Sequence, residues 1–207
     1  MNGQLILAVV ITAALSYLLG CCNTSIVISK YVLRDDVRNH GSGNAGLTNF
    51  YRVFGKQKIL LVILADVLKT VIAVLAGVAL FRWAGSDPII GKLLGGLLCM
   101  VGHMFPFQFE FKGGKGVLAG GTMACFMGWK VAVAVWGIFF LMVILTRFVS
   151  LGSVGAGVLY PISVGLVYQN LWYTLLALAA GGLLVWRHKD NIKRLLRGEE
   201  SKLKLHK

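Results

Sequence analysis

The sequence predicts an all-α polytopic membrane protein with about seven transmembrane helices, and three observations lead to that prediction. Hydrophobic residues make up 57% of the 207 residues, whereas soluble domains contain about 45–50%. Charged residues make up 14%, against about 25% in soluble domains. Apolar runs recur along the chain, and several approach the length of about 20 residues that a membrane-spanning helix needs.

Each apolar run is expected to form one helix. The runs cover about residues 5–28, 59–81, 89–107, 117–129, 131–145, 151–167 and 171–186. The fourth run is short, and Lys130 alone separates it clearly from the fifth, so we expect residues 117–129 to form a short or irregular span. The whole chain, 1–207, is expected to be one integral membrane domain that ends in a basic cytoplasmic tail, 187–207.

Basic residues predict the orientation, because cytoplasmic loops carry an excess of Lys and Arg. No basic residue precedes Lys30, whereas a secretory signal peptide begins with positive charge, so the first helix is expected to be retained with its N-terminus outside. With seven spans, the outer side then holds only three of the 21 Lys and Arg residues: Arg82, Lys92 and Lys130. The C-terminus is therefore predicted to be cytoplasmic.

The net charge of +13 indicates an anionic partner. The apolar composition argues against nucleic acid and leaves anionic lipid or a phosphate-bearing ligand. The densest polar stretches, 34–58, 110–116 and 187–200, are all predicted on the cytoplasmic side, where three distant loops could build one site. No cluster of residues indicates a metal site.

The first polar motif runs from Gly41 to Arg52. Its glycines allow close backbone approach, and Ser42, Asn44, Thr48 and Asn49 offer hydrogen-bonding groups to a substrate. Arg52 carries a planar fork that suits phosphate or carboxylate. An ordinary turn between two helices is the alternative interpretation.

The second motif is Lys112-Gly113-Gly114-Lys115-Gly116. Consecutive glycines can turn backbone N–H groups inward to form an anion-binding nest, and the helix expected from Val117 adds its positive N-terminal end. The motif is not a phosphate-binding Walker A loop, because Gly116-Val117 follows Lys115. A basic, flexible loop at the membrane edge is the alternative.

The third motif runs from His188 to Glu200. On a helix His188 and Asn191 share a face; the histidine can move a proton near neutral pH, and the amide can orient a hydroxyl. The alternative is an amphipathic basic tail that lies on anionic lipid.

For the other polar residues within apolar runs, a structural role is the first expectation. Asp66 and Lys69 lie three residues apart and predict an ion pair inside the bundle, with a role in holding the site as the alternative. His103 is expected to be a core histidine. Ser150 and Ser153 are expected either to cap a helix or to contact substrate.

Taken together, in order and spacing, these motifs resemble PlsY, the bacterial membrane family of acyl-phosphate:glycerol-3-phosphate acyltransferases. The resemblance covers Ser42–Arg52, Lys112–Val117 and His188–Glu200. It implies a cell (inner) membrane enzyme whose site faces the cytoplasm and which transfers an acyl chain from acyl phosphate to the 1-hydroxyl of glycerol 3-phosphate. The products would be lysophosphatidic acid and phosphate.

The resemblance also implies residue roles and partners. Ser42, Arg52, His188 and Asn191, with Lys115, would form the polar core of the site, and Glu200 would be structural. Membrane lipid and the enzyme that makes acyl phosphate would be partners, and no cofactor is implied. Leu47, Thr70 and Cys21–Thr24 depart from the pattern of the family. These departures leave the acyl-chain preference open, and they allow the chain to be a divergent paralogue that uses another acceptor.

The sequence leaves alternatives open for both the proton acceptor and the class of function. The acceptor of the hydroxyl proton could be His188 or a phosphate oxygen of the substrate. A transporter or flippase for a phosphorylated solute would instead need polar residues along a path through the bilayer. A scaffold that binds anionic lipid would not explain the spacing of Gly, Ser, Asn and Lys.

Overall fold

The computed structural model describes residues 3–203, and every regular element in that range is helical. The elements are α1 (Gly3–Cys21), α2 (Thr24–Val27), the π-helix η1 (Ile28–Val32), the 3₁₀ helix η2 (Val37–Asn39), α3 (Leu47–Phe54), α4 (Ile59–Trp83), α5 (Pro88–Met104), the 3₁₀ helix η3 (Phe107–Phe109), α6 (Val117–Phe126), α7 (Trp129–Thr146), α8 (Val149–Tyr168), α9 (Leu171–Arg187) and α10 (Lys189–Leu196). The predicted all-α class is confirmed.

All seven predicted apolar segments contain a helix. Within residues 3–203, five stretches are long and apolar enough to cross a membrane: Gly3–Val32, Ile59–Trp83, Pro88–Phe109, Trp129–Thr146 and Val149–Tyr168. Helices α6 and α9 are apolar but shorter. The count of seven spans therefore stays a prediction, as does the orientation of the termini.

The first segment is not the continuous helix that the sequence predicted over 5–28. Helix α1 ends at Cys21, and a new helical turn begins at Thr24. Asn23 causes the restart, since its side-chain oxygen accepts a hydrogen bond from the backbone N–H of Ile26, 3.3 Å away. The chain then continues as the π-helix η1.

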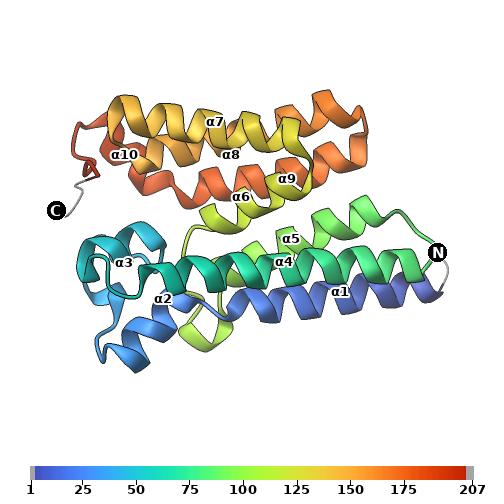
Figure 1. Ribbon diagram of the computed structural model, residues 1–207, viewed down its shortest axis with the longest axis horizontal. Coiled ribbons are helices and arrows are strands. Elements are labelled where there is room, and N and C mark those ends of the chain that lie inside the picture. The colour runs from blue at the N-terminus through green and yellow to red at the C-terminus, as the bar shows by residue number, and fades with distance from the viewer. Residues whose placement is uncertain (1–2, 204–207) are drawn as a thin grey trace. The chain divides into compact units, whose positions relative to one another are not determined.

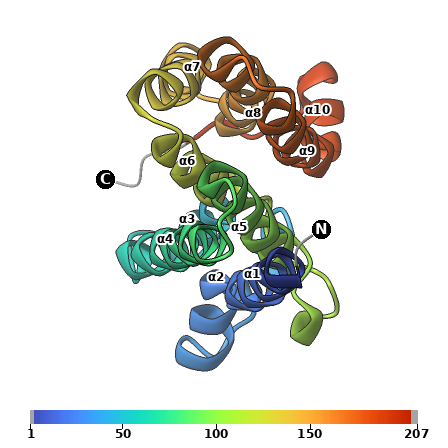
Figure 2. The ribbon, with the colours of Figure 1, turned by 90° about the vertical axis from the view of Figure 1, so that its right-hand side faces the viewer.

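The chain forms two compact units, residues 1–122 and 123–207, with the division inside α6. In the first unit α1, α4 and α5 pack side by side (Figures 1 and 2). In the second unit α7 packs on α8, and α8 packs on α9. Whether residues 1–207 act as a single domain stays a prediction.

Small residues allow the helices of the first unit to pack closely. Every fourth residue of α1 from Ala8 to Gly20 is buried, and α4 and α5 approach each other where Gly77 faces Gly91. A Cβ atom on either of these glycines would collide with the backbone oxygen of the other. Close packing of backbones at small residues is typical of membrane helices.

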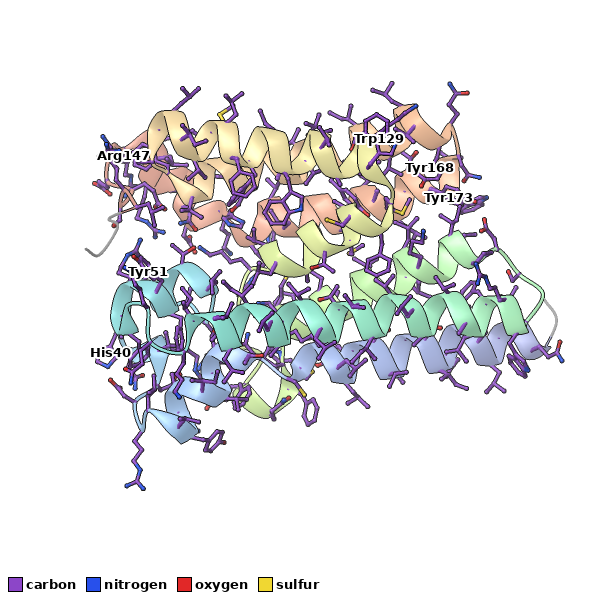
Figure 3. All side chains as sticks on the ribbon, viewed as in Figure 1. His40, Tyr51, Trp129, Arg147, Tyr168 and Tyr173 are labelled. Carbon is purple, nitrogen blue, oxygen red and sulfur yellow. The ribbon has the colours of Figure 1, made fainter. Side chains whose placement is uncertain are left out.

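Within each unit, one end carries the connections that hold the polar motifs. His40 and Tyr51 lie at that end of the first unit, where α1 and α5 finish and α4 begins (Figure 3). In the second unit Arg147 lies at one end, and Trp129, Tyr168 and Tyr173 lie at the other (Figure 3). Aromatic residues of this kind are enriched where membrane helices meet water.

Replacing Gly77 by alanine is expected to destabilise the first unit, because the added methyl group must push α4 and α5 apart. Overpacking of this kind lowers the free energy of unfolding by about 1–3 kcal/mol. The matched control is Gly137→Ala on α7, where an added Cβ meets no atom within 4 Å. Thermal unfolding of purified protein in detergent measures both, and equal unfolding temperatures for the two variants would contradict this packing.

Candidate functional site

The first motif rests on a small apolar core at the loop end of the first unit. This core consists of buried residues from the end of the first segment, the motif, α4 and η3: Ile26, Ile28, Val37, Ala45, Phe50, Val62 and Phe109. Because the polar loop covers its own core, Ser42 and Arg52 stay exposed on top of it. Asn44 and Thr48 are half-buried between these two residues along the chain.

Asn49 fixes the shape of this loop. Its side-chain oxygen accepts a hydrogen bond from the backbone N–H of Ser42 at 2.9 Å. Its side-chain nitrogen donates to the backbone oxygens of Val37 and His40, each at 3.0 Å. The buried amide of Asn49 therefore closes the loop on itself, and its predicted contact with substrate stays a prediction.

Arg38, in the turn just before the first motif, links that turn to the loop that precedes the second motif. The guanidinium of Arg38 donates to the carboxylate of Asp36, at 2.7 Å from Nη2 to Oδ2 and 3.0 Å from Nε to Oδ1. Its Nη1 donates to the backbone oxygen of Phe109, 3.1 Å away. Hydrogen bonding from Arg38 lowers the pKa of Asp36 below its ordinary value. The sequence analysis assigned no role to Asp36 or Arg38.

The glycines of the second motif do not form the predicted anion nest. The N–H of Gly113 donates to the backbone oxygen of Met104, and the N–H of Gly114 donates to that of His103, each at 3.1 Å. Both carbonyls belong to the last turn of α5, whose oxygens have no partner within the helix. The two N–H groups therefore close the C-terminus of α5, and both glycines are buried.

For the remaining residues of this motif, the predicted substrate contact stays a prediction. Lys112 is exposed, and its Nζ donates to Oε2 of Glu110 at 2.7 Å. Lys115 is half-buried, and Gly116 adopts a φ of +75° directly before α6 begins. The positive N-terminal end of α6 and the two lysines keep this segment suited to an anion.

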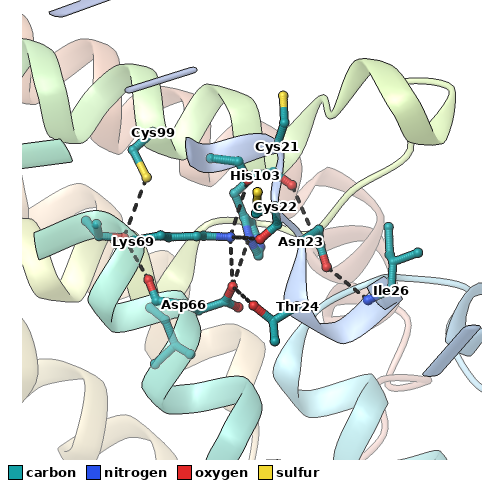
Figure 4. A network of polar contacts seen from close by, with 12 residues as sticks. Cys21, Cys22, Asn23, Thr24, Ile26, Asp66, Lys69, Cys99 and His103 are labelled. Carbon is teal, nitrogen blue, oxygen red and sulfur yellow. Dashed lines mark hydrogen bonds and ion pairs between the residues drawn. The ribbon is translucent and has the colours of Figure 1, made fainter. Parts of the chain in front are cut away.

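A buried polar network surrounds Asp66, Lys69 and His103 (Figure 4). The ring of His103 lies against Gly114 of the second motif. Asp66 and Lys69 form the predicted ion pair, with 2.7 Å between Oδ1 and Nζ. The same Nζ lies 2.9 Å from the backbone oxygen of Cys22 and 3.1 Å from Nδ1 of His103. Thr24 donates to Asp66 at 3.1 Å. The carboxylate, the ammonium and the imidazole thus satisfy one another away from water.

Glu200 organises the third motif in the second unit. Its Oε1 accepts hydrogen bonds from Oγ of Ser150 at 2.8 Å and from Nδ2 of Asn191 at 2.7 Å. Its Oε2 accepts from Nε of Arg194 at 2.8 Å. Burial acts to raise the pKa of Glu200, but the three hydrogen bonds, led by that from Asn191, outweigh it and hold the pKa below its ordinary value.

His188 is buried at the junction of α9 and α10. Its Nδ1 lies 2.8 Å from the backbone oxygen of Leu184. A carbonyl oxygen only accepts, so Nδ1 carries the hydrogen, and in the neutral ring Nε2 is the unprotonated nitrogen. The ring thus has the tautomer and the fixed orientation that a proton acceptor needs.

The two serines of α8 have different surroundings. Ser150 donates to Glu200, which ties the start of α8 to the third motif. Ser153 is buried, and its Oγ donates to the backbone oxygen of Val149 within the same helix, 2.9 Å away. The geometry makes both serines structural contacts, and their predicted contact with substrate stays a prediction.

The fold and the motifs define a class: a helical integral membrane protein whose basic and amide-rich loops gather at the helix ends of each unit. Residues 10–198 match the family model described as glycerol-3-phosphate acyltransferase. The chain therefore belongs to the glycerol-3-phosphate acyltransferase family of integral membrane enzymes, PlsY.

Individual relatives agree with this assignment. The glycerol-3-phosphate acyltransferase of Thermoanaerobacter pseudethanolicus is 36% identical over 194 residues, which cover 94% of this chain and 95% of the relative. The crystal structure of PlsY in its glycerol 3-phosphate form matches with a TM-score of 0.85 at 32% identity and covers 95% of this chain and 96% of that one. The lysophosphatidic acid form matches with a TM-score of 0.82 at 31% identity and with the same coverage.

Replacing Glu200 by glutamine is expected to lower the free energy of unfolding by about 1.5–3 kcal/mol at neutral pH, since a hydrogen bond to a charged group is lost. The folded-state pKa of Glu200 is depressed, so its contribution is complete above the ordinary glutamate pKa of about 4.3 and is lost as the pH falls through the lower folded value. Unfolding measured across that pH range should show a smaller acid-dependent loss in Glu200→Gln than in the unchanged protein. Its neighbour provides the control, Glu199→Gln, and an equal effect of both substitutions would refute the role of Glu200.

Proposed function

We propose that this protein transfers an acyl chain from acyl phosphate to the 1-hydroxyl of glycerol 3-phosphate, forming lysophosphatidic acid and inorganic phosphate for phospholipid synthesis. The observation that supports this most directly is the match, over 95% of the chain, to PlsY structures named for glycerol 3-phosphate and for lysophosphatidic acid. The acyl phosphate donor is proposed from the resemblance of the three motifs to that family.

The reaction needs charge neutralisation and a proton acceptor. The hydroxyl oxygen of glycerol 3-phosphate attacks the acyl carbon, the bond from that carbon to the phosphate oxygen breaks, and phosphate leaves with both electrons. Both substrates are anions, so Arg52, Lys112 and Lys115 are proposed to offset their repulsion and to stabilise the departing phosphate. Holding the two reactants together accounts for much of the rate, because acyl phosphate is already an activated anhydride.

His188 is proposed to accept the hydroxyl proton at Nε2. The hydrogen bond from Nδ1 to Leu184 supports this role, since it leaves Nε2 as the basic nitrogen and fixes the ring. Asn191, held by Glu200, is proposed to orient the hydroxyl. Ser42, Asn44 and Thr48 are proposed to bind the polar part of the substrates, from a loop that Asn49 holds in shape.

A polar substitution at position 188 tests the proposed proton acceptor without leaving a cavity at that position. His188→Asn keeps an N–H for Leu184 and removes Nε2, so turnover should fall by about 10²–10⁴-fold, the usual contribution of general base catalysis. The assay supplies palmitoyl phosphate and glycerol 3-phosphate to purified protein in lipid, and it measures lysophosphatidic acid and released phosphate. Palmitoyl-CoA serves as the control donor and should give no product.

The matched control is His40→Ala. This histidine is exposed and pairs with Asp35, so its loss should leave turnover near that of the unchanged protein. Normal turnover by His188→Asn would remove His188 from the reaction. Product from palmitoyl-CoA alone would overturn the proposed donor.

The protein is proposed to lie in the bacterial inner membrane with seven spans, an outer N-terminus and its reactive loops in the cytoplasm, near the enzyme that makes acyl phosphate. The distribution of Lys and Arg supports this orientation. In a variant without native cysteines, a membrane-impermeant thiol reagent added to intact cells should label Ser86→Cys and Gln169→Cys. It should not label Lys56→Cys or Glu199→Cys until the membrane is opened. Labelling of Lys56→Cys or Glu199→Cys in intact cells would contradict the orientation proposed for the unit that contains that residue.

A further inference from the structure

The loop between α5 and α6 has an unusual backbone that its surroundings must hold. Glu110 and Phe111 both adopt left-handed conformations, with φ of 58° and 57°, although neither is glycine. Such residues persist where the neighbouring structure fixes them, and they concentrate at functional sites. On one side of this pair Arg38 binds the backbone oxygen of Phe109. On the other side Gly113 and Gly114 bind the end of α5.

The second of these anchors depends on His103. Its backbone oxygen accepts hydrogen bonds from the N–H of Gly114 at 3.1 Å and from Nδ2 of Asn23 at 3.3 Å. Its ring lies directly against the same glycine, since a Cβ atom on Gly114 would collide with Nε2 of His103. His103 therefore contacts the second motif through both its backbone and its side chain.

The ring of His103 is in turn oriented by Lys69. A lysine ammonium only donates, so Nδ1, 3.1 Å from Nζ, accepts, and Nε2 carries the hydrogen in the neutral ring. Lys69 is itself fixed by Asp66 and by the backbone oxygen of Cys22 at 2.9 Å, and the backbone oxygen of Gly20, farther away at 3.3 Å, shares one of its three N–H groups. Figure 4 shows this chain of contacts running from α4 through Lys69 to the ring of His103.

We propose that Asp66, Lys69 and His103 are positioning residues: the buried pair orients the His103 ring, and the ring sets the second motif, and with it Lys115, for binding the phosphoryl group of a substrate. This inference rests on the proposed function for the identity of the ligand, but not for the effect on the loop. In this proposal the buried ion pair does more than stabilise the helix bundle, and His103 does more than fill the core.

The direct test is His103→Asn in the purified protein. Asparagine keeps an acceptor near the position of Nδ1 for Lys69 and removes the part of the ring that meets Gly114. Amide hydrogen exchange over residues 105–116 should become at least about tenfold faster, while exchange in the helical parts of α4 and α5 stays unchanged. With palmitoyl phosphate and glycerol 3-phosphate, kcat/KM should fall by about 10–100-fold, mainly through KM.

Three further variants separate positioning from general stability. His103→Gln can place an amide nitrogen where Nε2 lies, so it should recover part of the lost kcat/KM. The double variant Asp66→Asn/Lys69→Met removes both charges together, which avoids a lone buried ion, and it should loosen the same loop. Thr70→Val, which loses a buried hydroxyl bonded to the backbone of Asp66 on the same helix, should leave both the loop and KM unchanged.

The outcomes are distinguishable from failure of the proposed function. Unchanged exchange over 105–116 in His103→Asn would overturn the inference, and so would equal acceleration of exchange throughout α4 and α5. An unchanged protein that forms no lysophosphatidic acid would contradict the proposed function, yet the exchange measurement would still report on the loop.

Discussion

A buried carboxylate surrounded by donors from several elements is the interaction on which the polar end of each unit depends. In the first unit Asp66 binds Lys69 and Thr24, and in the second Glu200 binds Ser150, Asn191 and Arg194. Removing one member of such a set leaves the others uncompensated in a low-dielectric environment, which costs more than the interaction itself contributes. The carboxylates of Asp66 and Glu200 therefore each hold the surrounding loops in a single arrangement.

This constraint explains how short, glycine-rich and highly charged loops keep a defined geometry. The helices of the first unit pack through small residues and give the loops a rigid base. Asn49 closes the first motif, and Arg38 ties the turn before that motif to the α5–α6 loop at Phe109. The end of α5 accepts hydrogen bonds from the N–H groups of Gly113 and Gly114. Arg52 and Lys112 remain at the surface of these fixed loops, so the anion binding proposed for them would need little further ordering.

The sequence predicted much of this fold because membrane helices are encoded by local composition. Each apolar run contains a helix, and the Asp66–Lys69 pair follows from the cost of a lone charge inside an apolar run. The motifs were found because glycine, lysine, histidine and asparagine are chemically distinctive at those spacings. The match of residues 10–198 to the family model confirms the family that those motifs indicated.

What the sequence could not predict is the pairing of distant groups. Nothing near Gly113 or Gly114 shows that their N–H groups serve α5, so the predicted nest was wrong. Ser150 and Glu200 lie 50 residues apart, and only the packing of the second unit brings them together. The helical restart after Cys21 depends on a hydrogen bond that the Asn23 side chain accepts from the N–H of Ile26, in a run that is otherwise apolar enough to continue.

Enzymatic transfer, as opposed to transport, is tested most directly with the purified protein in sealed lipid vesicles and labelled glycerol 3-phosphate. The account predicts that label enters the lipid phase as lysophosphatidic acid, and only when palmitoyl phosphate is also supplied. Unmodified glycerol 3-phosphate accumulating inside the vesicles without an acyl donor, and no labelled lipid with one, would contradict it and indicate a transporter.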